Sequence, residues 1–435
     1  MSVPLKALTS RLRQSSLFRN TLWFLGGNGV RLLVQAAYFV VIARALGVAQ
    51  YGAFIGAVAL MALVAPFSSW GAGFILIKNV VRDRGKFAHY WGVAFCITIA
   101  AGTALVLIVT AVSRIIWGKS LPATVLLFVG ISDVILLRIL ELAAQAFTAI
   151  ELLRRNSELY IVLSILRAVT AVGFTVLVPT HTAASWALLY MLSALVASVY
   201  SVIVIVRSFG LPRWGLRLSY SEFKEGFYYA VAQVSQTIYN DIDKTMLVRF
   251  GGLDATGIYG AAYRIVDASF APVSALVHAA FPRFFRHGEQ GVSGSLRFAR
   301  MLIACSAAYG FGATVFLYAV APILPFVLGR DFESATVALR WLSLLVLIRS
   351  IHYFLADSLT GAGLQALRTV IQLVVVVINV LLNVWLIPIY SWVGAAWASI
   401  ASDGALGLGL LIAIAIVHKH TPASELETLE SRVAM

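Results

Sequence analysis

Long apolar runs recur along almost the whole chain, and each is about as long as a helix that crosses a lipid bilayer. A transmembrane helix needs about 20 mostly apolar residues, because the hydrocarbon core is about 30 Å thick. Only 12% of the residues are charged and 60% are hydrophobic, so a soluble fold could not cover this much apolar surface. The pattern predicts an all-α polytopic membrane protein of about twelve transmembrane helices. We place the spans at 21–43, 52–77, 90–112, 122–148, 159–178, 184–206, 226–248, 256–280, 301–324, 338–362, 369–388 and 393–417.

Basic residues are distributed unequally between alternate loops. If the first run enters from the cytoplasm, 21 lysines and arginines fall on the cytoplasmic side and six on the other. Cytoplasmic loops of membrane proteins collect Lys and Arg, so this bias predicts that both termini are cytoplasmic. It also accounts for the net charge of +14 without a nucleic acid as partner.

The two halves of the chain repeat. Tyr51-Gly52-Ala53 recurs as Tyr259-Gly260-Ala261, and Cys96 recurs as Cys305, at offsets of 208 and 209 residues. Since each half holds an even number of spans, both enter from the same side, as in parallel repeats about an axis along the membrane normal. We therefore expect two six-helix lobes, a linker and a tail: residues 1–207, 226–417, 208–225 and 418–435, with the linker and tail on the cytoplasmic side.

Cations and amides inside the apolar runs are the candidates for a binding site. An arginine near the bilayer centre costs about 2.5–3.5 kcal/mol on insertion scales and usually faces a bundle interior or a wet cavity. Guanidinium groups bind phosphate oxygens and amides suit sugar hydroxyls, so such a cavity favours a bulky anion with hydroxyl-rich parts. The alternative is that the polar stripes only join helices. The candidates are Asn28, Arg31 and Gln35 on one helical face, Gln236, Asn240 and Lys244 on another, and Arg167 and Arg349.

Acids inside the runs have two interpretations. Asp403 has no cation near it in its own span, so it either pairs with a lysine or arginine elsewhere or binds a proton or sodium ion that drives transport. Asp241 and Asp243 share this ambiguity, and all three are candidates for ion coupling.

Two further charge pairs have helical spacing. Arg138 and Glu141, and Arg264 and Asp267, lie three residues apart, which places each pair on one helical face. We interpret both pairs as salt bridges that fix helix rotation.

Motifs for other chemistries are absent from the sequence. It has no G-x-x-x-x-G-K-[ST] phosphate loop, and no H-E-x-x-H or clustered Cys and His set for a metal enzyme. We expect no catalytic residues, metal or cofactor, and transport that draws on an ion gradient, the membrane potential or the gradient of the cargo.

The N-terminal block resembles that of bacterial polysaccharide-export proteins. These are the Wzx-type O-antigen and exopolysaccharide repeat-unit flippases of the multidrug/oligosaccharidyl-lipid/polysaccharide exporter superfamily. The residues that carry the resemblance are Asn28, Arg31, Ile42-Ala43-Arg44, Leu46-Gly47, Tyr51-Gly52, Pro66-Phe67, Gly71 and Lys78.

The resemblance implies a function in polysaccharide assembly. Such flippases move an undecaprenyl-diphosphate-linked oligosaccharide across the bacterial inner membrane for O-antigen, capsule or exopolysaccharide assembly, beside a polymerase and a chain-length regulator. It implies that the diphosphate meets Arg31 and Lys244, with Arg349, while the polyprenyl tail stays in membrane lipid. Similar peptidoglycan-precursor flippases commonly have two further spans.

Three other functions are consistent with parts of the pattern. A cation-coupled multidrug antiporter of the same superfamily would favour acids over arginines in its cavity. A membrane-embedded polysaccharide polymerase is the less favoured alternative, because such an enzyme normally needs a sizeable periplasmic loop and no loop here is that long. A scaffold without transport would have no use for the buried charges.

Overall fold

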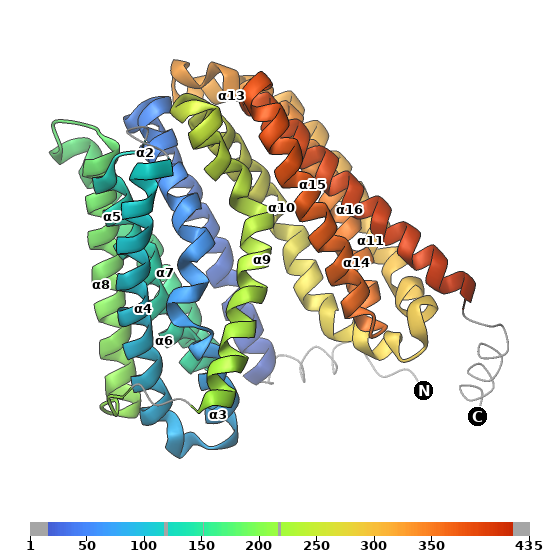
Figure 1. The fold of residues 1–435 in the computed structure, drawn as a ribbon, viewed down its shortest axis with the longest axis horizontal. Coiled ribbons are helices and arrows are strands. Elements are labelled where there is room, and N and C mark those ends of the chain that lie inside the picture. The colour runs from blue at the N-terminus through green and yellow to red at the C-terminus, as the bar shows by residue number, and fades with distance from the viewer. Residues whose placement is uncertain (1–15, 117–120, 151, 216–218, 421–435) are drawn as a thin grey trace. The chain divides into compact units, whose positions relative to one another are not determined.

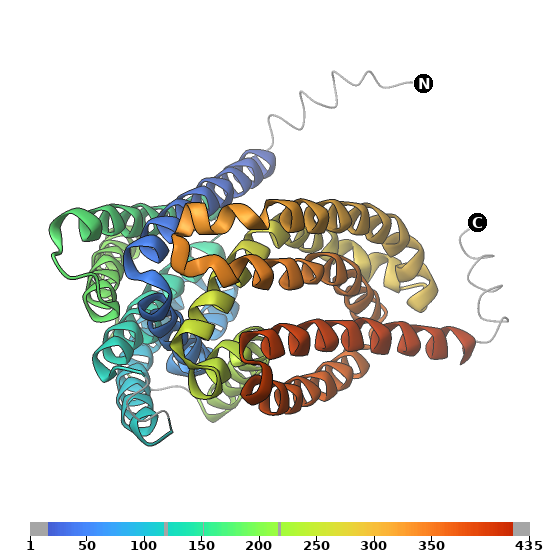
Figure 2. The same cartoon turned by 90° about the horizontal axis from the view of Figure 1, so that it is seen from above.

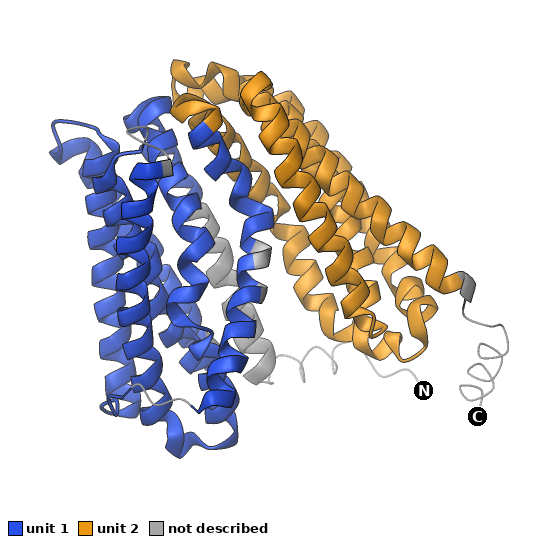
Figure 3. Ribbon diagram, viewed as in Figure 1, with its two compact units in different colours: residues 1–249 blue, residues 250–435 orange. Residues whose placement is uncertain are grey.

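The computed structural model describes residues 16–116, 121–150, 152–215 and 219–420, and these are helical apart from turns and short connections (Figure 1). Side chains are described over the same ranges except those of residues 16–33, 116, 153, 232, 235, 236, 419 and 420. The contacts divide the chain into two compact units, residues 1–249 (unit 1) and 250–435 (unit 2) (Figure 3).

Unit 1 consists of antiparallel helices, and most of their ends lie within about six residues of the predicted spans. The predicted span 52–77 is wrong as one helix, because the chain turns at Trp70 and Gly71 between α2 and α3. Its elements are α2 (Ser16–Ser69), α3 (Ala72–Arg82), η1 (Arg84–Lys86), α4 (Phe87–Ile116), α5 (Ala123–Gly130), η2 (Ile131–Leu136), α6 (Leu137–Ala149), α7 (Leu153–Leu177), α8 (Ala183–Phe209) and α9 (Tyr220–Phe250). Small residues of α6 such as Ala143 and Ala146 are fully buried, which lets the neighbouring helices pack closely around Trp91 and Phe147.

Unit 2 has the same helical character. Its elements are α10 (Gly252–Gly288), α11 (Gly291–Val320), η3 (Ala321–Ile323), α12 (Leu324–Leu328), η4 (Arg330–Phe332), α13 (Glu333–Leu342), α14 (Leu344–Gly361), α15 (Gln365–Tyr390) and α16 (Trp392–His420). Phe284 and Phe354 lie in the buried core where α10 packs on α14. Figures 1 and 2 show α15 and α16 side by side, and an amide of α15 joins them because Asn379 donates to the Ser402 hydroxyl (3.0 Å).

The all-α polytopic fold is confirmed. In the described part of the chain, ten helical stretches are long and apolar enough to cross a membrane. The first of these, Val34–Ser69, contains parts of two predicted spans, which Gly47 separates with a φ of 69° that only glycine adopts readily. The seventh predicted span, 226–248, is α9, which is too polar to be counted among the ten.

The division between the units falls after α9, not in the predicted linker 208–225. The physical reason is that the first turns of α9 pack against α2 and α3, as described below. The expected lobe boundaries at 207 and 226 stay a prediction.

Candidate functional site

The chain turns sharply between α2 and α3, and α9 lies directly on this corner. Trp70 and Gly71 both have positive φ angles, 48° and 66°. Gly226 of α9 lies so close that a Cβ on it would come within 2.3 Å of the Trp70 carbonyl oxygen. The two glycines therefore bring the backbones of the corner and of α9 into contact.

Aromatic rings also stabilise the contact between α9 and the corner of α2 and α3. The Trp70 indole N–H donates to the Phe223 carbonyl oxygen (3.2 Å), and its ring stacks on that of Phe223 at 5.0 Å between centroids. Phe74 of α3 stacks on Tyr229 of α9 at 4.8 Å. These rings hold the first turns of α9 against unit 1.

Charged and phenolic groups complete the α9 contact. Lys78 Nζ lies 2.7 Å from Glu225, and the Tyr90 hydroxyl donates to Glu222 (2.6 Å). Partial burial acts to raise the pKa of the Glu222 carboxyl, but hydrogen bonds from Tyr90 and Ser219 outweigh it and hold that pKa below its ordinary value. Glu222 is therefore ionised and fixed between α3, α4 and α9.

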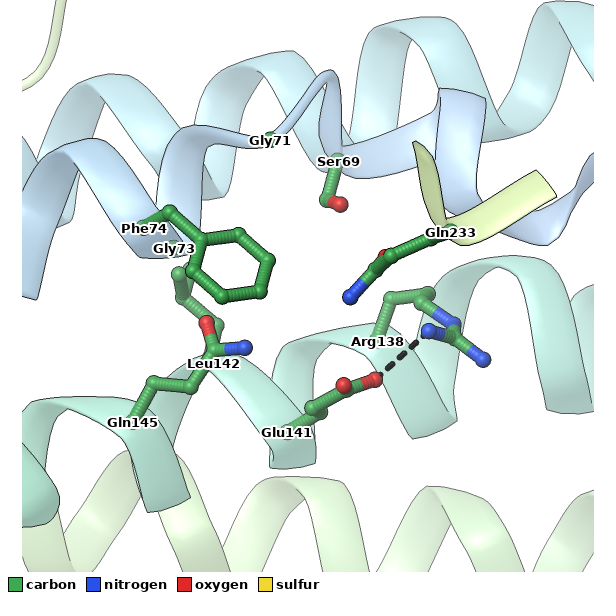
Figure 4. Close-up of a pocket in the computed structure, with 9 residues that line it drawn as sticks. All are labelled: Ser69, Gly71, Gly73, Phe74, Arg138, Glu141, Leu142, Gln145 and Gln233. Atoms are coloured by element: carbon green, nitrogen blue, oxygen red, sulfur yellow. Dashed lines mark ion pairs between the residues drawn. The ribbon is translucent and has the colours of Figure 1, made fainter. Parts of the chain in front are cut away.

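A polar pocket lies beside this corner, inside unit 1 (Figure 4). It is a small hollow, open in part to solvent, with room for about one water molecule. Its lining residues come from the corner, from α6 and from α9: Ser69, Gly71, Gly73, Phe74, Arg138, Glu141, Leu142, Gln145 and Gln233. A polar pocket among membrane-spanning helices is a place where a hydrophilic group can be bound.

Two kinds of polar group face the pocket. Arg138 pairs with Glu141 at 2.7 Å, which confirms the salt bridge predicted from their spacing. The side-chain amides of Gln145 and Gln233 make no hydrogen bond to the residues that the structure describes. Gly73 makes room for the first amide, because a Cβ there would lie 1.6 Å from Gln145 Oε1. The pocket thus offers an occupied ion pair and two amides with free hydrogen-bonding capacity.

Arg167 lies in a second polar cluster of unit 1. Its guanidinium is 3.7 Å from the Asp133 carboxylate and 4.0 Å from the centre of the Tyr190 ring. Asp133 also accepts hydrogen bonds from Ser132 (3.0 Å) and Tyr190 (3.3 Å). Its segment Ile131–Leu136 is a π-helix, a form that often occurs at functional sites. Both charges are buried and matched.

Lys244 of α9 is held by its own helix. Its Nζ donates to the Asn240 carbonyl (2.9 Å) and to Asp241 Oδ1 (2.7 Å), and its backbone N–H donates to Asp243 (2.7 Å). Asp241 is half-buried and Asp243 is buried. The sequence left Asp241 either paired with a cation or binding a coupling ion, and in the structure it forms an ion pair with Lys244. That Asp241 or Asp243 binds a coupling ion stays a prediction.

Arg349 of α14 is the centre of a buried network in unit 2. Its Nε donates to Asp403 of α16 (2.9 Å), its Nη2 donates to the Tyr263 hydroxyl, and its Nη1 lies 3.5 Å from Asp267 of α10. Asp403 thus pairs with an arginine of another helix, one of the alternatives left by the sequence. Asp267, which we paired with Arg264 on spacing, approaches Arg349.

The other candidate residues are placed as follows. Gln35 lies half-buried on α2. The side chains of Asn28, Arg31 and Gln236 lie outside those described, so their proposed role stays a prediction. Sequence reasoning missed Gln145, although it follows Arg138 and Glu141 at positions i+7 and i+4 of one helical face, a signal that was available. It also missed Tyr190 and Tyr263, for which no local signal exists.

Comparisons with known proteins agree with this architecture. A family model described as "Polysaccharide biosynthesis protein" matches residues 17–287. The chain is 24% identical over 378 residues to a probable low-salt glycan biosynthesis flippase, Agl15, of Haloferax volcanii, covering 83% of this chain and 75% of that one.

Solved transporters have the same fold. The lipid II flippase MurJ in an inward closed conformation superposes with a TM-score of 0.73 at 12% identity, over 93% of this chain and 89% of that one. An inward-facing multidrug resistance MATE family transporter of the MOP superfamily gives 0.72 at 13% identity, over 90% and 96%.

Proposed function

The chain belongs to the polysaccharide biosynthesis protein family, and from this we propose that it is a flippase that moves a lipid-linked oligosaccharide across a membrane. The cargo we propose is an oligosaccharide repeat unit on undecaprenyl diphosphate. The membrane is then the bacterial inner membrane, with both chain termini in the cytoplasm. A polymerase and a chain-length regulator would act on the exported units.

The observation that carries this proposal is the polar pocket of unit 1. Arg138, Glu141, Gln145 and Gln233 gather among membrane-spanning helices beside the ring of Phe74. Charges in such helices are costly and face a wet interior, so the pocket supports a hydrophilic cargo. Amides and an aromatic ring are groups that suit hydroxyls and sugar faces.

The buried cations support an anionic group on the cargo. Lys244 and Arg349 contact Asp241 and Asp267, whose side chains are 29% and 56% exposed. An exposed carboxylate beside a buried cation occupies a place that a phosphate oxygen can take. We propose that a phosphate group of the cargo can replace the carboxylate beside each of these cations, and that Arg31, with Asn28 and Gln35, contributes from α2. We propose that Gln236, Asn240 and Arg167 are further cargo-binding residues of unit 1.

A deletion experiment tests the function. Loss of this chain should abolish surface polysaccharide while lipid-linked repeat units accumulate in the cell. Complementation by Arg31→Ala or Lys244→Ala should fail although the variants insert in the membrane normally, and Arg297→Ala, at an exposed position of α11, should restore export. Undiminished surface polysaccharide in the deletion strain would overturn the flippase assignment, and normal export by both alanine variants would overturn the cation site.

A cation-coupled multidrug antiporter is the second candidate function. The carboxylates of Asp241, which is partly exposed, and of Asp267, which is exposed, favour it, because an organic cation could bind them. Drug tolerance of the deletion strain separates the two: the antiporter predicts greater sensitivity to cationic drugs with polysaccharide unchanged.

A further inference from the structure

The Arg349 network of unit 2 contains two carboxylates that compete for one arginine. Asp403 is almost completely buried and lies 2.9 Å from Arg349 Nε, whereas Asp267 is 56% exposed and lies 3.5 Å from Nη1. The guanidinium has a planar set of five N–H donors, so it can serve both acids and can shift between them. Which carboxylate the Arg349 guanidinium approaches more closely depends on which of the two carries a negative charge.

His352 places a proton acceptor on the far side of Asp403. It lies one turn after Arg349 on α14 and is 3% exposed. Its Nε2 is 3.4 Å from Asp403 Oδ1, the oxygen that does not accept from Arg349 Nε. Among the described residues this nitrogen has no hydrogen-bond partner. A buried polar nitrogen without a partner is rare and needs an explanation.

We infer that Asp403 and His352 together form a proton-binding site that controls Arg349. A proton from water binds at Asp403 Oδ1, and the resulting O–H donates to His352 Nε2, which gives that nitrogen its missing partner. The neutral carboxyl no longer attracts the guanidinium, which shifts toward the charged Asp267. The proton comes from a hydronium ion, whose O–H bond breaks as the new O–H bond forms and which leaves as water; no other covalent bond changes.

The surrounding charges are consistent with such a switch. The titratable and charged groups that act on Arg349 and His352 are Tyr263 and Asp267 of α10, Tyr353 of α14 and Arg368 of α15. Further out, Asp357 of α14 interacts with Arg368 and with His278 of α10. Arg368 is occupied by Asp357 at 3.1 Å. Arg349 is therefore the cation that responds directly to the charge of Asp403.

Asp267 connects the proton site to the cargo. An exposed carboxylate in a membrane-spanning helix must face water, since lipid would not solvate it. When Arg349 shifts toward it, the guanidinium approaches the same wet surface, where an anionic group of the cargo can compete with Asp267. This last step rests on the proposed function; the proton site itself does not.

Infrared difference spectroscopy tests the proton site on the purified full chain in lipid nanodiscs, without cargo. The spectra are compared between alkaline and acidic pH. We expect a protonated-carboxyl band that is missing in Asp403→Asn and shifted in frequency in His352→Gln. The matched control His418→Gln, which alters a histidine bonded to Ser293, should leave the band unchanged.

Each outcome decides the inference. An unchanged band in Asp403→Asn, or one that His352→Gln and His418→Gln affect equally, would overturn it. If Asp403→Asn does not fold, the His352→Gln shift alone decides. If the spectra assign the band to Asp403 while the deletion strain still exports polysaccharide, the proton site stands and the proposed function is overturned.

Discussion

Arg167 shows how a single buried cation is held in a membrane protein. It lies between the Asp133 carboxylate and the face of Tyr190, at 3.7 Å and 4.0 Å. Taking two charges out of water is costly, and their attraction compensates only while both are present. The pair therefore constrains which substitutions the cluster tolerates.

We predict that the single variant Asp133→Leu is much less stable than the double variant Asp133→Leu/Arg167→Met. The single variant leaves an unmatched buried cation, which costs about 3–5 kcal/mol, whereas an apolar pair of similar size is often tolerated. Unfolding of the four proteins of the double-mutant cycle in detergent measures the coupling. Additive effects of the two substitutions would show that the charges do not interact.

Glu222 gives the α9 contact a dependence on pH. This residue precedes the seventh predicted span, and hydrogen bonds from Tyr90 and Ser219 hold the pKa of its carboxyl below the ordinary 4.5, although burial opposes them. A depressed pKa in the folded state stabilises the contact above the ordinary pKa, and this contribution is lost as the pH falls through the folded value.

We therefore expect the start of α9 to loosen in acid, below about pH 4.5. Amide hydrogen exchange in residues 219–226, corrected for the intrinsic effect of pH, should rise on acidification in the parent chain. Glu222→Gln should exchange faster at neutral pH and respond less to acid. Equal pH responses in the two proteins would contradict the role of Glu222.

At the scale of elements, α9 is the helix whose placement the sequence describes least well. Its polar face predicts a binding helix, and nothing in its composition predicts that its first turns dock on the corner of α2 and α3. That docking depends on Trp70 and Gly71 adopting positive φ angles and on Gly226 having no side chain. It forms between residues more than 150 positions apart, beyond the reach of local periodicity.

We predict that Gly226→Ala releases the start of α9. The new Cβ would meet the Trp70 carbonyl at 2.3 Å, and overpacking of this kind typically costs about 1–3 kcal/mol. Trypsin should then cleave faster after the exposed Lys224 in the membrane-bound protein. Gly173→Ala is the matched control, because a Cβ there meets no atom within 4 Å. Equal cleavage of both variants would mean that the glycine contact does not hold α9.

Elements with a strong local signal were predicted well. The apolar runs predicted the membrane spans because each run is long, and i,i+3 spacing predicted Arg138 with Glu141 because both lie on α6. Arg349 and Asp403 are 54 residues apart, and only the packing of α14 on α16 joins them. The sequence identifies Arg349 and Asp403 as functional candidates, but it does not show whether each is an unpaired charge or part of an ion pair.

At the scale of the whole molecule, the unequal distribution of basic residues predicts the orientation of the chain in the membrane, and the proposed function depends on that orientation. A flippase that collects cargo made inside the cell must present its entrance to the cytoplasm, so the orientation of the chain matters as much as its fold. The 21 to 6 division of Lys and Arg between alternate loops predicts cytoplasmic termini and a cytoplasmic turn between α10 and α11.

Single-cysteine labelling tests this orientation. In a background of Cys96→Ala and Cys305→Ala, Glu289→Cys replaces an exposed residue of the α10–α11 turn, and Thr180→Cys replaces one between α7 and α8. A thiol reagent that does not cross membranes should label Thr180→Cys in intact cells and should label Glu289→Cys only after the inner membrane is opened. The two positions form a matched pair. If the chain were inverted, Glu289→Cys would be labelled in intact cells and Thr180→Cys would not. If an odd number of spans had been missed between them, both would lie on the same side of the membrane. Either result would contradict the cytoplasmic entrance that the proposed function needs.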